Sequence, residues 1–249
     1  MPENVKVKNL LGTGERVNIE NIGSDFVSLA SHQLRTPLSA IKWNIEILLK
    51  ERQGRLTIRQ KQYLEEIYRL NERAINLVND LLDVSRIQEG QIHLQYTLIR
   101  AEDIIEEVIQ SFSSLIKTTK IKVNFEIVNG PLPKILTDAE KLKRVVINLL
   151  SNAIKYTPQN KEVHVSVEKK DRYLKVSIAD SGVGITKEER KKIFSKFFRS
   201  PRIIKIAPDG TGLGLFIAKF LLKAMGGKIS FQSRDGMGTT FYFTLPLKN

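Results

Sequence analysis

The hydrophobic period of this chain changes once, at Glu89-Gly90, and the change limits the fold to two unlike parts. Before this point apolar residues recur every three or four positions, which is the spacing of one face of a helix. After it, four segments alternate apolar and polar residues with the period of two that is typical of strands. These segments are 121–127, 163–168, 174–178 and 239–245. The sequence therefore predicts a helical region followed by a region of mixed helices and strands.

Two long helices are predicted in the first region. One covers residues 24–52, and the other begins after Thr57, which has Gln60 three residues later in a capping-box pattern. Their apolar stripes consist of Phe26, Ala30, Leu34, Leu38, Ile41, Ile45 and Leu48 in the first helix and Ile67, Leu70, Ala74, Leu77, Leu81 and Val84 in the second. Two antiparallel helices cannot bury such long stripes against each other alone, so we expect a homodimer in which two hairpins form a four-helix bundle.

The second region adds three predicted helices, at 101–117, 137–155 and 212–225. Thr137 and Glu140 form a capping-box pattern at the start of the middle helix. Two glycines after residue 225 mark the end of the last helix. Helices and strands mixed in this order predict an α/β sandwich, in which a sheet carries helices on one face.

We divide the chain into a linker over residues 1–23 from an absent upstream module, a helical domain over 24–90 and an α/β domain over 91–249. The chain has no cysteine, and its three histidines are too far apart in sequence for a short zinc-ligand spacing. No apolar run approaches the ~20 residues of a membrane span, and the start shows no signal-peptide pattern. We therefore expect a cytoplasmic segment, and membrane anchoring of the parent protein stays open.

The net charge of +13 is concentrated in the second region, where residues 91–249 carry 27 basic and 15 acidic side chains. This excess fits a solvated basic surface, a nucleic acid or the phosphate tail of a nucleotide. No helix-turn-helix or other nucleic-acid recognition motif accompanies it. We therefore expect no nucleic-acid partner.

His32 faces away from the apolar stripe of the first helix. At 100° per residue it projects about 180° from the direction of Leu34 and Ile41, which predicts an exposed imidazole. Such a ring near neutral pH is nucleophilic and can accept a phosphoryl group. Thr36 lies one turn away on the same face, and Pro37 should bend the helix there. Trp43, farther along this face, either anchors a partner protein or packs against the second helix.

Three polar residues of the predicted helix 137–155 share one face. Asn148, Asn152 and Lys155 lie opposite the apolar positions of that helix. Amide oxygens can bind a hard cation without adding negative charge beside a triphosphate, and the lysine offsets phosphate charge. Asp180 follows a predicted strand and can accept a hydrogen bond from an adenine amine. The pattern is also compatible with a polar helix face followed by a simple turn.

Two further segments suit a phosphate tail. Gly210-Thr-Gly-Leu-Gly214 opens the last predicted helix, where glycines expose backbone amide donors to an anion. The stretch 187–205 holds eight basic and two acidic residues with phenylalanines between them, which we interpret as a mobile basic lid. Arg199 in this lid is the best candidate to reach a terminal phosphate. A solvated charge run with buried aromatics is the alternative interpretation.

Ser-His-Gln-Leu-Arg-Thr-Pro-Leu at 31–38 resembles the phosphoacceptor box of sensor histidine kinases. The motifs around Asn148, Asp180, Phe194–Phe198 and Gly210–Gly214 resemble, in order and spacing, the N, G1, F and G2 boxes of the same family. The resemblance implies a dimeric helical hairpin followed by a Bergerat-type ATP-binding sandwich. It also implies ATP with Mg²⁺ as phosphoryl donor, and the receiver domain of a response regulator as partner.

The resemblance also implies roles for individual residues. His32 would be the phosphoacceptor, with Gln33 and Thr36 beside it. Asn148 and Asn152 would hold Mg²⁺, and Asp180 would bind adenine. The remaining implied ATP-binding residues are Lys155, Tyr156, Gly182, Gly184, Arg199, Gly210, Thr211, Gly212, Leu213 and Gly214.

Gln33 departs from the family pattern, which usually has Glu or Asp directly after the histidine. An amide can orient an imidazole but cannot act as a general base. We therefore expect an active but slow autokinase, and Thr36 suggests that it also dephosphorylates the regulator. The alternatives are a non-catalytic module that binds a regulator, and another ATPase of the same superfamily such as a gyrase-type enzyme.

Overall fold

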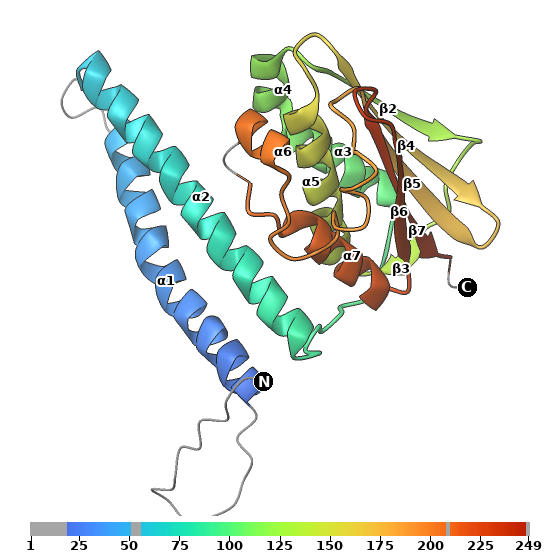
Figure 1. The fold of residues 1–249 in the computed structure, drawn as a ribbon, viewed down its shortest axis with the longest axis horizontal. Coiled ribbons are helices and arrows are strands. Elements are labelled where there is room, and N and C mark those ends of the chain that lie inside the picture. Colours follow the sequence, from blue (N-terminus) through green and yellow to red (C-terminus); the bar gives the residue numbers. More distant parts are fainter. Residues whose placement is uncertain (1–18, 51–55, 208–209, 248–249) are drawn as a thin grey trace, which may run out of the picture.

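The computed structural model describes residues 19–50, 56–207 and 210–247. Within these ranges it does not describe the side chains of residues 19–29, 32 and 50. A helical hairpin is followed by an α/β sandwich, and the helices of the sandwich lie between the hairpin and the sheet (Figure 1). The predicted combination of a hairpin and a sheet with helices on one face is confirmed.

The hairpin consists of α1 (Ile19–Lys50) and α2 (Ile58–Gln88). Helix α1 begins five residues before the predicted start, so 19–23 are helical, and the rest of the expected linker lies outside the described residues. Helix α2 begins as predicted: the Thr57 side chain accepts from the backbone of Gln60, and the Gln60 side chain accepts from the backbone of Thr57. Both halves of the capping box are therefore present.

Polar contacts between the two helices fix their register. Arg35 donates to Asn79 (2.8 and 3.1 Å), and Lys42 pairs with Glu72 (2.9 Å). Farther along α1, Glu46 accepts a hydrogen bond from the hydroxyl of Tyr68 (3.1 Å). Each step forward on α1 is thus matched by an equal step back on α2. The same register places position 32 level with position 82.

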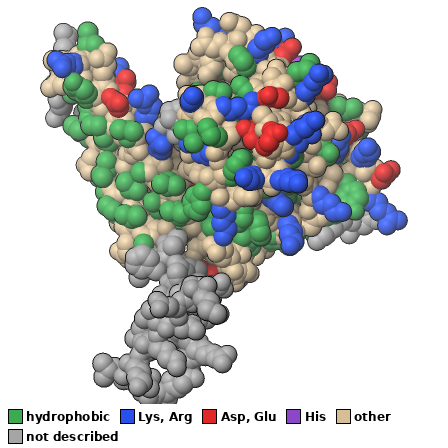
Figure 2. All heavy atoms as spheres, viewed as in Figure 1, with side chains coloured by type: hydrophobic (Ala, Val, Ile, Leu, Met, Phe, Trp, Pro, Cys, Tyr) green, Lys and Arg blue, Asp and Glu red, His purple; other side chains and the backbone are tan. Residues whose placement is uncertain are grey.

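Much of the apolar stripe of the hairpin stays exposed. Leu34 and Ile41 of α1 are 51% and 44% exposed, and Ile67, Leu70 and Leu77 of α2 are also exposed. Hydrophobic side chains gather along the hairpin in Figure 2. A contiguous apolar surface of this kind is typical of a protein interface.

The sandwich contains a five-stranded mixed sheet of order β2-β4-β5-β7-β6. Its strands are β2 (Lys122–Val128), β4 (Glu162–Lys170), β5 (Tyr173–Asp180), β6 (Lys228–Ser233) and β7 (Thr239–Pro246). Strands β2 and β4 are parallel, and the other neighbours are antiparallel. A separate antiparallel pair joins β1 (Thr97–Ile99) to β3 (Ile135–Thr137). Residues 89–96 connect α2 to β1 without a helix or strand.

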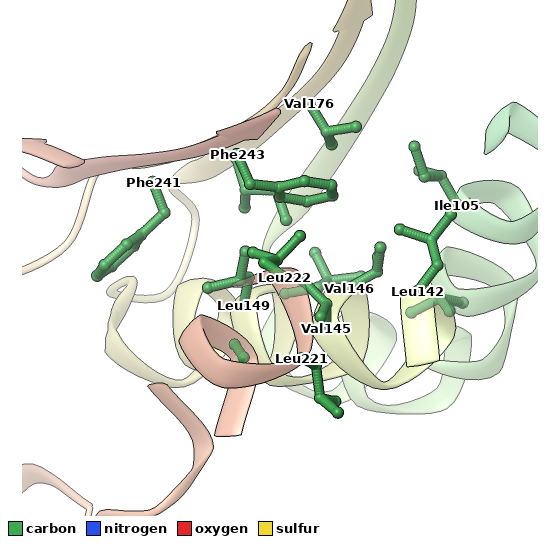
Figure 3. Packing of buried hydrophobic residues seen from close by; sticks show 14 of the residues in the cluster. Ile105, Leu142, Val145, Val146, Leu149, Val176, Leu221, Leu222, Phe241 and Phe243 are labelled. Carbon is green, nitrogen blue, oxygen red and sulfur yellow. The ribbon is translucent and has the colours of Figure 1, made fainter. Parts of the chain in front are cut away.

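Five helices complete the sandwich. They are α3 (Ala101–Ser111), α4 (Ser113–Thr119), α5 (Ala139–Tyr156), α6 (Pro201–Ile206) and α7 (Gly214–Ala224). Leu149 of α5 and Leu222 of α7 pack against Phe243 of β7 in the core (Figure 3). Val84 and Ile87 at the end of α2 belong to the same cluster, so the hairpin and the sandwich share one core.

Several predicted boundaries are wrong. The helix expected at 101–117 is two helices interrupted at Phe112. The residue that caps α5 is Asp138, whose carboxylate accepts from the backbone of Lys141, whereas Thr137 ends strand β3. Helix α7 begins two residues after its predicted start, and Gly226 after it has the expected positive φ of 77°. Helix α6 and strands β1, β3 and β6 were not predicted.

Within the described part of the chain, no helix combines the length and the hydropathy that a membrane span requires.

Candidate functional site

A pocket of about 330 Å³ lies between α5, the end of β5 and the segment that joins β5 to α7. The predicted residues in its lining are Asn148, Asn152, Lys155, Tyr156, Asp180, Gly184, Arg199, Gly210, Thr211, Gly212 and Gly214. Two predicted residues are outside the lining: Gly182 donates its backbone N–H to Asp180, and Leu213 is fully buried in the core. The fold thus brings segments far apart in sequence into one wall.

Helix α5 supplies the polar wall because its two faces differ. Asn148, Asn152 and Lys155 follow one another at helical spacing on the pocket side, whereas Leu142 and Leu149 are fully buried on the core side. The Nδ2 atom of Asn148 is buried without a hydrogen-bond partner. A buried amide without a partner is costly, so this atom indicates a place for a ligand.

Asp180 is a half-buried carboxylate of the pocket. Its Oδ1 accepts hydrogen bonds from the backbone N–H groups of Gly182 (2.8 Å) and Thr239 (3.2 Å). Burial outweighs these bonds and raises the pKa of Asp180 from 3.8 to about 6. The carboxyl is therefore mostly ionised at pH 7 and can accept a further hydrogen bond from a ligand N–H.

The glycine-rich loop approaches two cationic side chains closely. A Cβ at Gly210 would lie 3.1 Å from Nε of Arg199 and 3.2 Å from Nζ of Lys155. Gly212 has a φ of +73°, and a Cβ there would come within 2.7 Å of the backbone of Phe197. The absence of side chains at these positions keeps backbone amides and two positive charges together, which suits an anion.

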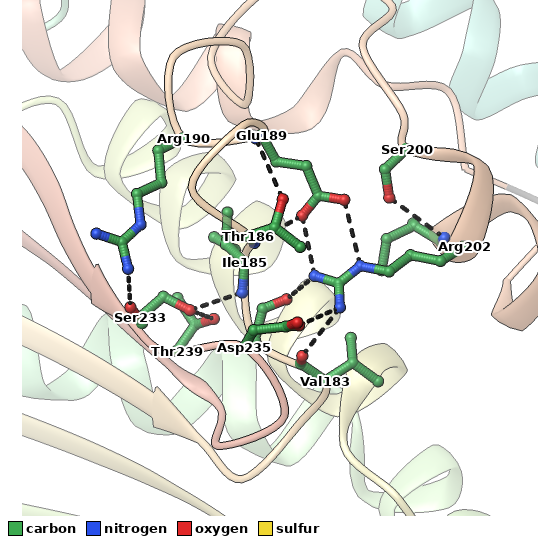
Figure 4. A network of polar contacts seen from close by, with 12 residues as sticks. Val183, Ile185, Thr186, Glu189, Arg190, Ser200, Arg202, Ser233, Asp235 and Thr239 are labelled. Atoms are coloured by element: carbon green, nitrogen blue, oxygen red, sulfur yellow. Dashed lines mark hydrogen bonds and ion pairs between the residues drawn. The ribbon is translucent and has the colours of Figure 1, made fainter.

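The basic segment 187–205 is tied to the rest of the sandwich by Arg190, which donates to the carbonyl of Ser233 (2.6 Å), and by Arg202 of α6. The guanidinium of Arg202 bonds the carboxylates of Glu189 (2.9 Å) and Asp235 and the carbonyls of Val183 and Gly184 (Figure 4). Burial raises the pKa of Glu189, but its hydrogen bonds outweigh burial and the pKa is lowered overall. Arg202 thereby joins α6 to the loop after Asp180 and to the β6–β7 turn. These contacts anchor the segment that we predicted as a mobile lid.

The donor set of the pocket fits a cation that arrives with a phosphate ligand. Asn148 and Asn152 offer two neutral amide oxygens, and Lys155 and Arg199 offer positive charge beside them. Among the described residues there is no cluster of three histidine, cysteine, aspartate or glutamate side chains that would form a metal centre by itself. A Mg²⁺ ion that is already bound to a nucleotide fits this donor set, because it needs few protein ligands and its phosphates suit the positive charge of Lys155 and Arg199.

The predicted phosphoacceptor region lies on α1, outside the pocket lining. Gln33 and Thr36 are exposed, and Trp43 on the same helix is 66% exposed. The backbone of His32 is helical, but its side chain lies outside the described residues, so its orientation stays a prediction. Position 32 is level with position 82 of α2, close to Asp80, which does line the pocket.

Two family models match the chain. Residues 24–90 match the His Kinase A (phospho-acceptor) domain, and residues 137–249 match the histidine kinase-, DNA gyrase B-, and HSP90-like ATPase family. The catalytic domain of the histidine kinase ThkA is 33% identical to this chain, with a TM-score of 0.55. The match covers 61% of this chain and 96% of the ThkA domain. The chain belongs to the histidine kinase family.

One further solved structure and a curated relative extend the comparison. Full-length ShkA in complex with AMPPNP has a TM-score of 0.74 and 28% identity over 91% of this chain and 46% of ShkA. The non-motile and phage-resistance protein of Caulobacter vibrioides is 35% identical over 94% of this chain. The histidine kinase chain spans only 29% of the length of that relative.

Sequence reasoning missed some residues of this histidine kinase pocket. Thr239 and Phe241 enter it from β7, and Glu189 and Ser200 enter from the basic segment. Asp80 enters from α2 of the hairpin. The alternation of β7 could have placed Phe241 on the core side, but no local pattern marks Asp80.

Proposed function

We propose that this chain is the catalytic region of a two-component protein-histidine kinase, which transfers the γ-phosphoryl group of ATP to His32. The observation that carries the proposal is the pocket itself, where a half-buried carboxylate, an amide wall and a glycine-rich loop with two cations meet. The proposed domains are 24–90 for dimerisation and phosphotransfer and 91–249 for ATP binding.

The pocket residues have distinct proposed tasks. Asp180 accepts a hydrogen bond from the adenine amine, and Tyr156 lies beside the nucleotide. Asn148 and Asn152 hold Mg²⁺ through their amide oxygens. Bound Mg²⁺ neutralises phosphate charge. The remaining residues around the phosphates are Lys155, Arg199 and the loop Gly210–Gly214, and Gly182 and Gly184 shape the turn beside the base.

The transfer step needs positioning more than covalent help from the protein. A nitrogen of the neutral His32 imidazole forms a bond to the γ-phosphorus, while the bond from that phosphorus to the bridging oxygen breaks and ADP leaves. The ring then loses the proton from its other nitrogen. Gln33 can orient the ring but cannot take this proton, so the proton goes to water.

The register of the hairpin supports this assignment. Position 32 on α1 is level with position 82 on α2, and Asp80 of α2 lines the nucleotide pocket. The acceptor helix and the pocket wall therefore occupy the same level of the hairpin. A hairpin shifted by several turns would separate them.

We also propose a homodimer and a response-regulator partner. The exposed apolar stripe on α1 and α2 would be covered by a second hairpin, as in a four-helix bundle. A structure of ThkA in complex with the response regulator protein TrrA has a TM-score of 0.60 and 26% identity over 94% of this chain. By analogy, an aspartate of a receiver domain would accept the phosphoryl group from His32. Thr36 would assist the dephosphorylation of the regulator, in which water takes the phosphoryl group from the aspartate and inorganic phosphate leaves.

The test is incubation of the chain with γ-labelled ATP and Mg²⁺. We expect an acid-labile, alkali-stable label on the protein, lost in both His32→Ala and Asn148→Ala. ATP binding, measured separately, should survive in His32→Ala and fall in Asn148→Ala. A label that persists in His32→Ala would refute His32 as acceptor.

Gln33 favours a second candidate, a module that binds nucleotide and docks a regulator without catalysis. In that case the wild-type chain would bind ATP and form no labelled protein even after long incubation. The same assay therefore separates the two functions.

A further inference from the structure

Asp80 is a carboxylate of the hairpin that lies in the wall of the nucleotide pocket. It is 8% exposed and lines the pocket together with Asn148, Lys155 and Gly210. None of the roles proposed above accounts for a buried carboxylate at this position. A negative charge close to a proposed phosphate site calls for an explanation.

The carboxylate of Asp80 bridges two parts of the sandwich. Its Oδ1 accepts from the guanidinium of Arg144 on α5, and its Oδ2 accepts from the hydroxyl of Thr211 (3.0 Å). The oxygen of Thr211 in turn accepts from the backbone N–H of Leu213 (3.2 Å). Helix α2 is thereby tied to the glycine-rich loop directly before α7.

The two charged side chains beside Asp80 act on its ionised form in opposite directions, because Arg144 favours this form and the carboxylate of Asp83 disfavours it. Arg144 is its cationic partner, and Asp83, one turn along α2, lies 3.6 Å from Nε of the same arginine. Burial raises the pKa of Asp80 above its usual value, whereas Arg144 and the Thr211 hydroxyl oppose that shift. A phosphate tail entering beside Lys155 and the loop would meet this carboxylate in poorly solvated surroundings, where repulsion is strong.

We propose that Asp80 is a positioning residue which the hairpin supplies to the nucleotide pocket: it holds the glycine-rich loop against α2 and thereby weakens the binding of nucleotide phosphates. The proposal rests on the proposed nucleotide site. Phosphates and Asp80 compete for the Thr211 hydroxyl and repel each other. By linkage, a bound phosphate tail must weaken the contact between hairpin and loop by the same factor.

Binding of AMPPNP and of adenosine to the full chain tests the proposal, because adenosine has the base without the phosphates. Asp80→Asn keeps the shape of the side chain and removes its charge. We expect AMPPNP with Mg²⁺ to bind about five- to fiftyfold more tightly to this variant. Adenosine should bind as it does to the wild type.

Asp83→Asn is the matched control. It neutralises a carboxylate on the same helix beside the same arginine, but Asp83 does not line the pocket. This variant should leave AMPPNP affinity near the wild-type value. Equal AMPPNP affinity in Asp80→Asn and wild type, or an equal gain in both variants, would overturn the proposal. If the wild type binds neither AMPPNP nor adenosine, the proposed nucleotide site itself fails.

Hydrogen exchange on the wild-type chain provides a second measurement that does not depend on a folded variant. Saturating AMPPNP with Mg²⁺ should speed exchange of the α2 amides around Asp80, and saturating adenosine should not. Equal exchange of these amides with both ligands would refute the coupling.

Discussion

The hairpin and the sandwich hold their apolar side chains in opposite ways. In the hairpin, Leu34 and Ile67 are 51% and 47% exposed, whereas Leu149 and Phe243 in the sandwich are 0% and 1% exposed. The sandwich completes its core from its own chain and the end of α2. The hairpin leaves a stripe that only another surface can cover. The stability of the hairpin should therefore depend more strongly on protein concentration than that of the sandwich.

The largest expected effect is on the hairpin. Ile67→Glu places a carboxylate on the exposed stripe, and each dimer would have to bury two of them. We expect the dimer to weaken by roughly a thousandfold, which size-exclusion chromatography with light scattering would show as monomers. Arg69→Glu puts the same charge on α2 outside the stripe and should remain dimeric. A monomeric wild-type chain would show that no second copy covers the exposed stripe of the hairpin.

The next effect belongs to the core of the sandwich. Leu149→Ala should lower its free energy of unfolding by about 2–5 kcal/mol, because the surrounding helices and sheet cannot close the cavity. Urea unfolding monitored by circular dichroism measures this loss. Leu34→Ala, an equal truncation at an exposed position, should cost about 0.5 kcal/mol or less at concentrations below dimerisation. Similar losses in both variants would contradict the difference in burial.

Replacing Asp180 should have smaller effects, and it should change stability and nucleotide affinity in opposite directions. Burial raises its pKa from 3.8 to about 6, so its charge lowers the stability of the folded state at pH 7, and this cost disappears below the unfolded pKa. Asp180→Asn should raise the free energy of unfolding at pH 7 by about 1–3 kcal/mol. ADP affinity should fall about 10- to 100-fold. Asp171→Asn, an exposed control in the β4–β5 turn, should change neither quantity.

The smallest expected effect is a pH dependence of base binding. Adenosine has no phosphate to titrate, so its affinity reports on Asp180 directly. As pH falls from 7 to 5 through the pKa of about 6, the carboxylate becomes mostly protonated. Adenosine affinity should then drop about tenfold by NMR titration. The drop should be absent in Asp180→Asn, and a flat profile in the wild type would show that Asp180 does not bind the base as an anion.

The elements that were predictable from the sequence are those with a long, clear period. Helix α2 and strands β4, β5 and β7 carry enough repeats to fix their type, and the Thr57–Gln60 capping box fixed one boundary. Strands β1 and β3 have three residues each, too few to show alternation. Helix α6 is short and lies in a run of charged residues, so no helical period of apolar residues marks it.

Prediction of the pocket from the sequence is likewise limited to residues with a local pattern. Asparagines on one helix face and glycines before a helix are local signals, and the structure brings them together. The bond from Thr211 to Asp80 spans 131 residues and depends on how the hairpin packs on the sandwich. Arg202 likewise works through partners from two separate connections, the segment after Asp180 and the β6–β7 turn. No periodicity encodes such contacts, since they are created by tertiary packing.

The short connection over residues 89–96 limits how far the ATP-binding sandwich can move from the hairpin. Fully extended, its eight residues reach ~26 Å, roughly the width of a small domain. Were the sandwich to leave its docked position, it would still be confined to the vicinity of its own dimer. Its bound nucleotide would then be presented to an acceptor at an effective concentration on the order of millimolar. The rate of phosphohistidine formation in an assembled dimer should therefore be insensitive to dilution.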